Sequence, residues 1–278
     1  MSIHQDDYVD LHIHTRANDG QWTPETLVKE AHRLGLRALA VTDHDTIKLV
    51  EETRREAASH SIQVIPGVEV NVTWRQNLYH LLLYNVNLQD GRLRRMLDDL
   101  FARHIARATA CRADMARRGL TLPPEAGISP YGDLLPILLI DAVIKAGYAT
   151  SFDSALDVLG DDEILNSAVP LAAAVEVAHA QGALAILAHP GRVDVPTPTV
   201  SPAMLLEMMD DAPLDGIEAH YCAYGPAETE LYNRFATEHR LLVTCGSDSH
   251  GPRDRRPLIK WPARSCWEFL KRCGLASG

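Results

Sequence analysis

YVDLHIHT, residues 8–15, alternates apolar and polar side chains as a β-strand with one buried face does. Leu11 and Ile13 fall on one face of such a strand, and His12 and His14 fall together on the other, because successive strand residues point to opposite sides. Two imidazoles on the same face can bind one metal ion. The stretch therefore predicts a strand whose apolar face joins a core and whose polar face carries two candidate metal ligands.

A regular alternation of strands and helices follows this first strand. Thr23 is the expected cap and Pro24 the first-turn residue of a helix over residues 24–34, which Gly35 ends. A second helix is expected over residues 47–58. Further strands are expected at residues 37–42, 62–68, 78–84, 184–188, 216–219 and 241–245. Repeated β/α units of this kind indicate an α/β fold with a parallel sheet or barrel.

Helical spacing replaces the β/α rhythm in the middle of the chain. Apolar side chains in residues 93–115 recur at helical intervals, and residues 137–146 form a second helical stretch. We therefore expect a barrel built from residues 1–90 and 170–278, with residues 91–169 as an inserted helical subdomain that caps its mouth.

The formal net charge of −10 over 278 residues limits the partners to be expected. Binding to duplex nucleic acid depends on clustered lysine and arginine, so we expect no duplex partner and instead a small anionic substrate held beside bound cations. Five cysteines without a CxxC pair predict neither a disulfide framework nor a zinc–thiolate site. The sequence shows no leader segment and no stretch near the ~20 apolar residues of a membrane span, so we expect a cytoplasmic protein.

Metal-binding side chains recur where the apolar runs end. TDHD at residues 42–45, AHPGR at 188–192 and GSDSHG at 246–251 each place a histidine soon after a strand. The carboxylate of Glu69, after another apolar run, is costly to bury unless it is paired or bound to metal. Barrel enzymes assemble active sites at the C-terminal ends of their strands, so these side chains should converge. The candidates beyond the first strand are His44, Glu69, His80, His189, Asp248 and His250. Histidines on helical faces, such as His104, are expected to be structural or solvated.

Other polar residues in or near these blocks have expected supporting roles. Asp10 and Asp43 are expected to orient ligands. Arg192 of AHPGR has the planar fork that suits a phosphate beside the metals. His220 is a candidate substrate contact, and Glu218 either orients a ligand or caps the sheet.

The blocks DLHIHT, NDG, TDHD, GVE, AHPGR and GSDSHG, in this order, resemble the PHP (polymerase and histidinol phosphatase) domain family along the whole chain, and its TrpH/YciV-like subgroup in particular. The resemblance implies a distorted, amidohydrolase-like (β/α)7 barrel with three divalent ions, commonly Mn2+, with zinc, iron or magnesium in some members. It adds Asp19 of NDG, which on its own is typical of a turn. The implied ligands are His12, His14, Glu69 and Asp248 for one ion, Asp19, His44 and His250 for a second, and Glu69 as a bridge with His80 and His189 for the third.

The resemblance also implies a metal-dependent phosphoesterase. Its expected reaction removes the 3'-phosphate from a nucleoside 3',5'-bisphosphate, such as 3'-phosphoadenosine 5'-phosphate, by attack of a metal-activated hydroxide. Arg192 would stabilise the transition state, and Asp43 would orient the ligands. A 5'-to-3' exoribonuclease acting on short, single-stranded, 5'-phosphorylated RNA is the main alternative. A histidinol phosphate phosphatase and a non-catalytic metal-binding module are weaker ones.

Several residues are candidates for binding the substrate. The expected contacts are Arg192, Arg16, His220 and Asn18, the last standing where the resemblance leads one to expect serine. The candidates for the second phosphate of a bisphosphate are Arg16, Arg192, Arg253 and Arg255, and the sequence does not choose among them.

Overall fold

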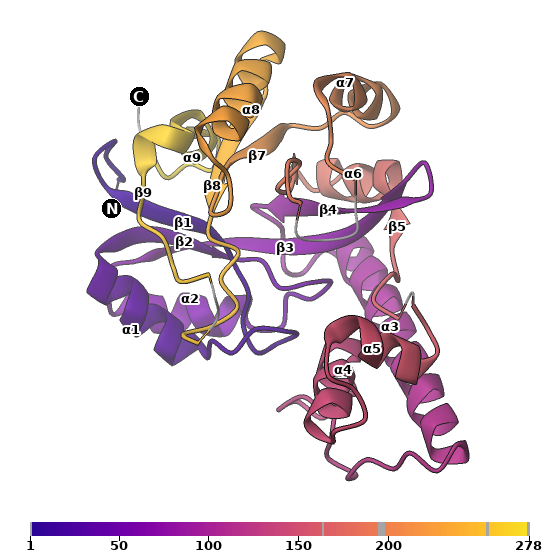
Figure 1. Ribbon diagram of the computed structural model, residues 1–278. Coiled ribbons are helices and arrows are strands. Elements are labelled where there is room, and N and C mark those ends of the chain that lie inside the picture. Colours follow the sequence, from indigo (N-terminus) through magenta and orange to yellow (C-terminus); the bar gives the residue numbers. More distant parts are fainter. Residues whose placement is uncertain (1, 163, 194–197, 254–255, 277–278) are drawn as a thin grey trace.

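The computed structural model describes residues 2–162, 164–193, 198–253 and 256–276, and their strands form one mixed sheet in the order β8-β7-β6-β4-β3-β2-β1-β9 (Figure 1). The short β5 (Val169–Pro170) pairs with β3 beside this path. The other strands are β1 (Tyr8–Ile13), β2 (Leu36–Val41), β3 (Gln63–Trp74), β4 (Asn77–Tyr84), β6 (Leu184–Leu187), β7 (Gly216–Tyr221), β8 (Leu242–Gly246) and β9 (Trp261–Pro262).

β1 and β8 lie at the two ends of the run of long strands, yet they also meet each other. The Asp248 amide donates to the His12 carbonyl at 2.8 Å, and the His14 amide donates to the Ser249 carbonyl at 2.9 Å. These bonds bring the residues after β8 alongside β1, so the sheet curves into a nearly closed barrel. The predicted α/β barrel is confirmed, and DLHIHT and GSDSHG are neighbours at one rim.

β4 runs against both of its neighbours. It pairs antiparallel with β3 and with β6, whereas β1–β2, β2–β3, β6–β7 and β7–β8 are parallel pairs. Arg75 and Gln76 connect β3 to β4 with φ of 48° and 66°, as a type I′ hairpin turn requires. The sheet therefore departs from the expected parallel arrangement at β4, because a two-residue connection can join only antiparallel strands.

The hairpin changes the position of two candidate ligands. β3 extends to Trp74, so Glu69 lies within this strand and not after its end. His80 lies in the first half of β4, opposite Asn71 of β3. Because β4 is reversed, its first half lies at the same rim as the second half of β3. His80 therefore reaches the rim at which the parallel strands end.

Helices cover the outside of the sheet. They are α1 (Pro24–Leu34), α2 (Val50–Ala58), α6 (Leu171–His179), α7 (Pro202–Asp211), α8 (Pro226–His239) and α9 (Trp267–Arg272), the last preceded by the 3-10 turn η1 (Ala263–Cys266). α1 has the expected bounds, with Thr23 accepting a hydrogen bond from the Thr26 amide and Gly35 left-handed at φ of 77°. α2 begins later than expected, because Asp45 turns the chain at φ of 52° and residues 46–49 do not continue as a helix.

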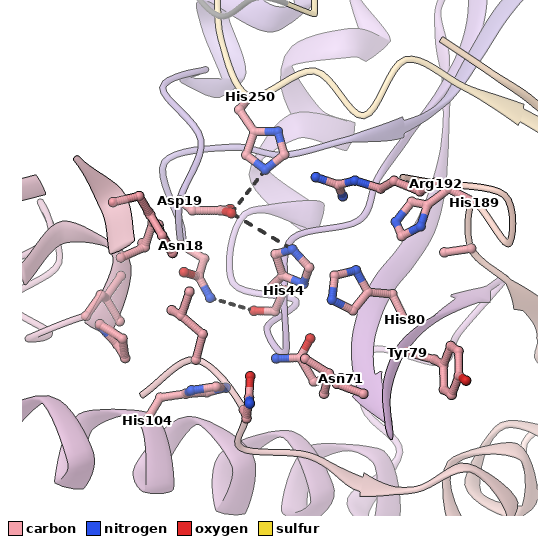
Figure 2. A pocket seen from close by; sticks show the side chains of 18 of the residues that line it. Asn18, Asp19, His44, Asn71, Tyr79, His80, His104, His189, Arg192 and His250 are labelled. Atoms are coloured by element: carbon pink, nitrogen blue, oxygen red, sulfur yellow. Dashed lines mark hydrogen bonds and ion pairs between the residues drawn. The ribbon is translucent and has the colours of Figure 1, made fainter. Parts of the chain in front are cut away.

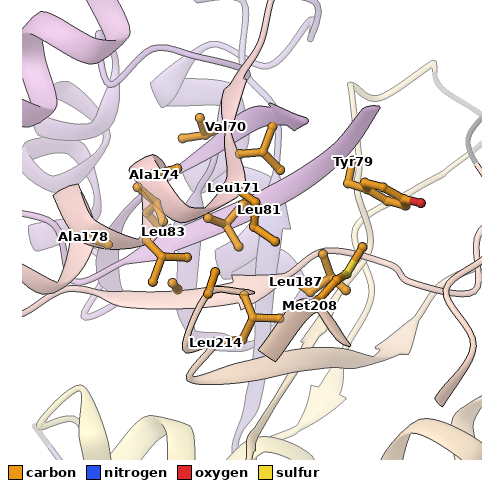
Figure 3. Packing of buried hydrophobic residues seen from close by; sticks show 14 of the residues in the cluster. Val70, Tyr79, Leu81, Leu83, Leu171, Ala174, Ala178, Leu187, Met208 and Leu214 are labelled. Atoms are coloured by element: carbon orange, nitrogen blue, oxygen red, sulfur yellow. The ribbon is translucent and has the colours of Figure 1, made fainter. Parts of the chain in front are cut away.

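The largest apolar core lies between the sheet and the helices α6 and α7. Val70, Leu81 and Leu83 of the β3–β4 hairpin pack with Leu171 of α6 and Met208 of α7 (Figure 3). These side chains are fully or almost fully buried. Since strand residues alternate between faces, this packing turns Glu69 and His80 toward the barrel interior.

Three helices of the middle segment lie beside the barrel (Figure 1). They are α3 (Gly91–Arg117), α4 (Pro136–Lys145) and α5 (Phe152–Leu159). Ala108 and Met115 of α3, Leu139 and Val143 of α4 and Leu159 of α5 form a core separate from that of the sheet. Over the described ranges, no helix is both long and apolar enough to cross a membrane.

Candidate metal centre

The ligand candidates from the sequence gather at one rim of the barrel. Figure 2 shows Asp19, His44, His80, His189 and His250 around one cavity. Behind them, the Nε2 atoms of His12 and His14 are 3.1 Å apart and lie 3.1 Å and 3.0 Å from Glu69 Oε2. Asp248 Oδ1 is 3.1 Å from His14 Nε2.

Three groups of these side chains have their donor atoms within 4.8 Å of one another. The groups are His12, His14, Glu69 and Asp248; His14, Asp19, His44 and His250; and His44, Glu69 and His80. The first group is the same as one ligand set implied by the family resemblance. The second group contains His14 in addition to its implied ligands, and the third contains His44. His189 joins the third group through Glu69, since its Nε2 lies 3.1 Å from Glu69 Oε1.

Several polar atoms of this cluster are buried without a hydrogen-bond partner. They are His14 Nδ1, Asp19 Oδ1, His44 Nδ1, Glu69 Oε2 and His80 Nδ1. A buried polar atom without a partner costs free energy, and a divalent cation would satisfy imidazole nitrogens and carboxylate oxygens together. The side chains therefore fit a multinuclear metal site.

The charges of the cluster also favour cations. Burial alone would lower the pKa of His12, but Glu69, Glu218 and Asp248 outweigh burial and raise it to about 10. His44 behaves in the opposite way, because burial lowers its pKa to about 3 despite the nearby carboxylates of Glu69 and Asp19. Carboxylates that draw a proton onto a buried imidazole would equally attract a divalent cation to the same place.

Three buried carboxylates lie near the ligands: Glu218 contacts two of them, and Asp43 and Asp10 bind residues next to them in the chain. Glu218 Oε1 is 3.1 Å from His12 Nδ1, and its Oε2 accepts a hydrogen bond from the His189 amide at 2.9 Å. Glu218 was expected either to orient a ligand or to cap the sheet. Its contact with His12 Nδ1 fits the first role, because it holds the ring with Nε2 toward the cluster. Asp43 Oδ2 accepts from the Thr15 hydroxyl at 2.7 Å, and Asp10 accepts from two backbone amides, those of residues 247 and 259.

Gly246 is required where β8 passes His12. A Cβ at this position would lie 2.2 Å from His12 Cβ and 2.6 Å from Glu218 Oε1. We expect Gly246→Ala to lower the free energy of unfolding by about 1–3 kcal/mol and to reduce bound metal, measured by urea unfolding and elemental analysis. Gly91→Ala is the matched control, because its added Cβ would meet only the flexible end of Arg95 at 3.4 Å. Equal stability of the two variants would contradict the close approach.

A cavity of about 830 Å³ opens at the cluster. Asn18 and Arg192 line it. His220 does not: its ring lies against Asn233 and Trp261, and this position gives no support to a substrate contact.

Two of the remaining arginine candidates, Arg16 and Arg253, do not line this cavity. Arg16 donates to the Tyr131 hydroxyl at 3.2 Å and is absent from the cavity lining. Arg253 is exposed and also absent from the lining. Arg255 lies outside the described residues.

Three residues of the site were not singled out from the sequence. Arg256 and Tyr221 both contact Asp248, and the arginine-rich stretch after GSDSHG was the only signal that pointed toward Arg256. His104 of α3 lines the cavity and contacts Asp45 Oδ2 at 2.9 Å. It was expected to be structural or solvated, without a companion; it is instead buried, and its contact with Asp45 joins the middle segment to the TDHD block.

A barrel whose rim groups histidines and carboxylates beside a cavity is the architecture of a metal-dependent hydrolase. The PHP domain model matches residues 10–92. The 5'-3' exoribonuclease Rnm of Salmonella typhimurium is 30% identical over 252 residues, which cover 87% of this chain and 85% of that protein. The 3',5'-nucleoside bisphosphate phosphatase of Chromobacterium violaceum is 26% identical, covering 88% and 87%. The chain belongs to the PHP domain family and is a metal-dependent phosphoesterase.

A solved structure supports the fold independently. The chain superimposes on a protein from Bifidobacterium adolescentis, assigned as a metal-dependent phosphoesterase, with a TM-score of 0.79 and 23% identity. The match covers 95% of this chain and 96% of the other. The barrel and the middle helices therefore occur together in a known fold.

Proposed function

We propose that this phosphoesterase removes the 3'-phosphate from a nucleoside 3',5'-bisphosphate, such as 3'-phosphoadenosine 5'-phosphate, giving AMP. The observation that carries the proposal is the uneven charge of the cavity. Among its described lining residues, the cationic ones are Arg192 and Arg256, both beside Asp248. A compact substrate with its phosphates at one end suits this distribution of charge.

The opposite wall of the cavity supports the same substrate class. Leu135, Ile137 and Leu156 of the middle segment supply apolar surface there, together with the carboxylates of Asp153 and Asp162. An uncharged base can lie against apolar side chains, whereas a long RNA backbone would meet two negative charges there and, among the described lining residues, no lysine or arginine beyond Arg192 and Arg256. The wall therefore favours a mononucleotide.

The protein groups would have separate tasks in this reaction. Divalent ions at the cluster, which we propose to be Mn2+, would polarise the phosphoryl oxygens and supply the nucleophile from water. Arg192 lies beside His189 at the edge of the cluster (Figure 2), where its planar fork would bind the phosphate that is removed. Asp43 and Glu218 are positioning residues, because they hold Thr15 and His12 and not the substrate.

A 5'-to-3' exoribonuclease is the second candidate function. Its support is the 30% identical relative from Salmonella typhimurium, which carries that name. Both reactions would use the same ligand cluster. The two functions differ in the length of substrate that the cavity must hold beyond that cluster.

One comparison decides between the two functions. With Mn2+ supplied, we expect release of inorganic phosphate from 3'-phosphoadenosine 5'-phosphate to exceed mononucleotide release from a 5'-phosphorylated RNA pentamer by at least about 10-fold in kcat/KM. Such a ratio corresponds to about 1.4 kcal/mol of differential transition-state binding. Faster release from the pentamer would overturn the proposal in favour of the exoribonuclease.

A further inference from the structure

Arg256 contacts Asp248, one of the candidate metal ligands. Its Nη1 hydrogen-bonds to Asp248 Oδ2 and lies 2.7 Å from the Tyr221 hydroxyl. Tyr221 donates to the same Asp248 oxygen at 2.9 Å, and Arg192 Nη1 lies 3.3 Å from it. Asp248 therefore divides its two oxygens, with Oδ1 facing His14 and Oδ2 facing the two arginines.

The positive charges of Arg192 and Arg256 gather at one end of Asp248. Two guanidinium groups share one carboxylate oxygen, and the other oxygen of that carboxylate belongs to the metal cluster. The Arg256 side chain is 13% exposed, and its Nε atom is buried without a hydrogen-bond partner. A buried cationic donor without a partner is costly unless an anion completes it.

Arg256 also lies where two cavities meet. It lines the cavity of about 830 Å³ together with the ligand cluster, and it lines a neighbouring cavity of about 400 Å³. Arg192 and Arg256 are the cationic residues that both cavities share in the described part of the chain. An anion next to the metals and a second anion on the same molecule would thus have two guanidinium groups within reach.

We propose that Arg256 binds the phosphate of the substrate that does not react. The inference rests on the proposed bisphosphate substrate and assigns its second anion to a specific side chain. Arg16 is held by Tyr131 away from the cavity, and Arg253 is exposed outside it. Arg192, in the same AHPGR block as His189, is already placed at the reacting phosphate. Arg256 is therefore a specificity-determining residue as well as a partner of Asp248.

Two substrates and two variants separate these roles of Arg256. We expect Arg256→Gln to raise KM for 3'-phosphoadenosine 5'-phosphate by roughly 10- to 100-fold, and to change KM for adenosine 3'-monophosphate, which lacks the second phosphate, by less than about 3-fold. Tyr221→Phe removes another donor to Asp248 without removing a positive charge, so it should affect both substrates equally. Equal losses on both substrates in Arg256→Gln would overturn the proposal and leave Arg256 as a positioning residue for Asp248.

Binding of AMP gives a readout that does not depend on turnover. AMP carries only the 5'-phosphate, which is the phosphate that does not react. Inorganic phosphate is added at saturation so that it occupies the metal cluster and AMP cannot bind there through its own phosphate. Calorimetry should show AMP binding roughly 10- to 100-fold more weakly to Arg256→Gln than to the unaltered protein at equal metal content. Equal affinities would contradict the proposal. If the unaltered protein binds AMP in this way but hydrolyses neither nucleotide, the proposed function fails while the assignment of Arg256 stands.

Discussion

Glu69→Gln is expected to reduce phosphate release by more than about 1000-fold and to lower the bound metal. Glu69 belongs to two of the three ligand groups and contacts His189 as well. Glutamine has nearly the same shape but no negative charge, so the change removes the bridging charge without opening a cavity. Steady-state phosphate release and elemental analysis of the purified variant would measure both effects.

The matched control for this variant is Glu207→Gln. Glu207 pairs with Arg75 on the protein surface, where both side chains are about half exposed. We expect no more than about a 2-fold change in activity and no change in metal content, because exposed ion pairs contribute little. If Glu69→Gln keeps both its metal and its turnover, the cluster cannot be the catalytic centre.

Removal of metal is expected to have an equally large effect. Dialysis against a chelator should lower phosphate release by more than about 1000-fold, and added Mn2+ should restore it. Without metal, the nearby carboxylates raise the pKa of His12 to about 10, outweighing the effect of burial, so at pH 7 this imidazole carries a proton. A cation must displace that proton before it can bind.

The sign of the pH dependence follows from this competition. Raising the pH toward the pKa of His12 weakens proton binding, so the Kd for Mn2+ should fall by up to about 10-fold per pH unit for each proton released. Lowering the pH should raise the Kd over the whole range below about pH 10, where His12 holds its proton, so at a fixed, subsaturating Mn2+ concentration activity should fall as the pH is lowered. Calorimetric titrations of the apo-protein in two buffers of different ionisation enthalpy would count the protons. Activity that survives the chelator, or a Kd that does not change between pH 6 and 8, would argue against histidine ligands.

Local sequence patterns predicted most of the secondary structure correctly. The cap at Thr23 and the left-handed Gly35 give α1 its bounds, and the alternation in YVDLHIHT gives β1 its buried face. Such features depend on neighbours within a few residues, so they are visible in the chain itself. The direction of β4 was missed because Arg75 and Gln76 are not typical hairpin residues, although both adopt positive φ.

The sequence by itself determined most of the side chains that can bind metal, because their chemistry and their places in or after apolar runs are local properties; Asp19 was added by the family resemblance. Only the tertiary structure decided which of them come together. The bonds from Asp248 and Ser249 to β1 close the barrel, and this closure brings GSDSHG next to DLHIHT. The pairing of β7 with β8 brings Tyr221 to Asp248, and the chain after β8 returns Arg256 to the same carboxylate. The meeting of DLHIHT and GSDSHG depends on strand order and register across more than two hundred residues, which no local pattern encodes.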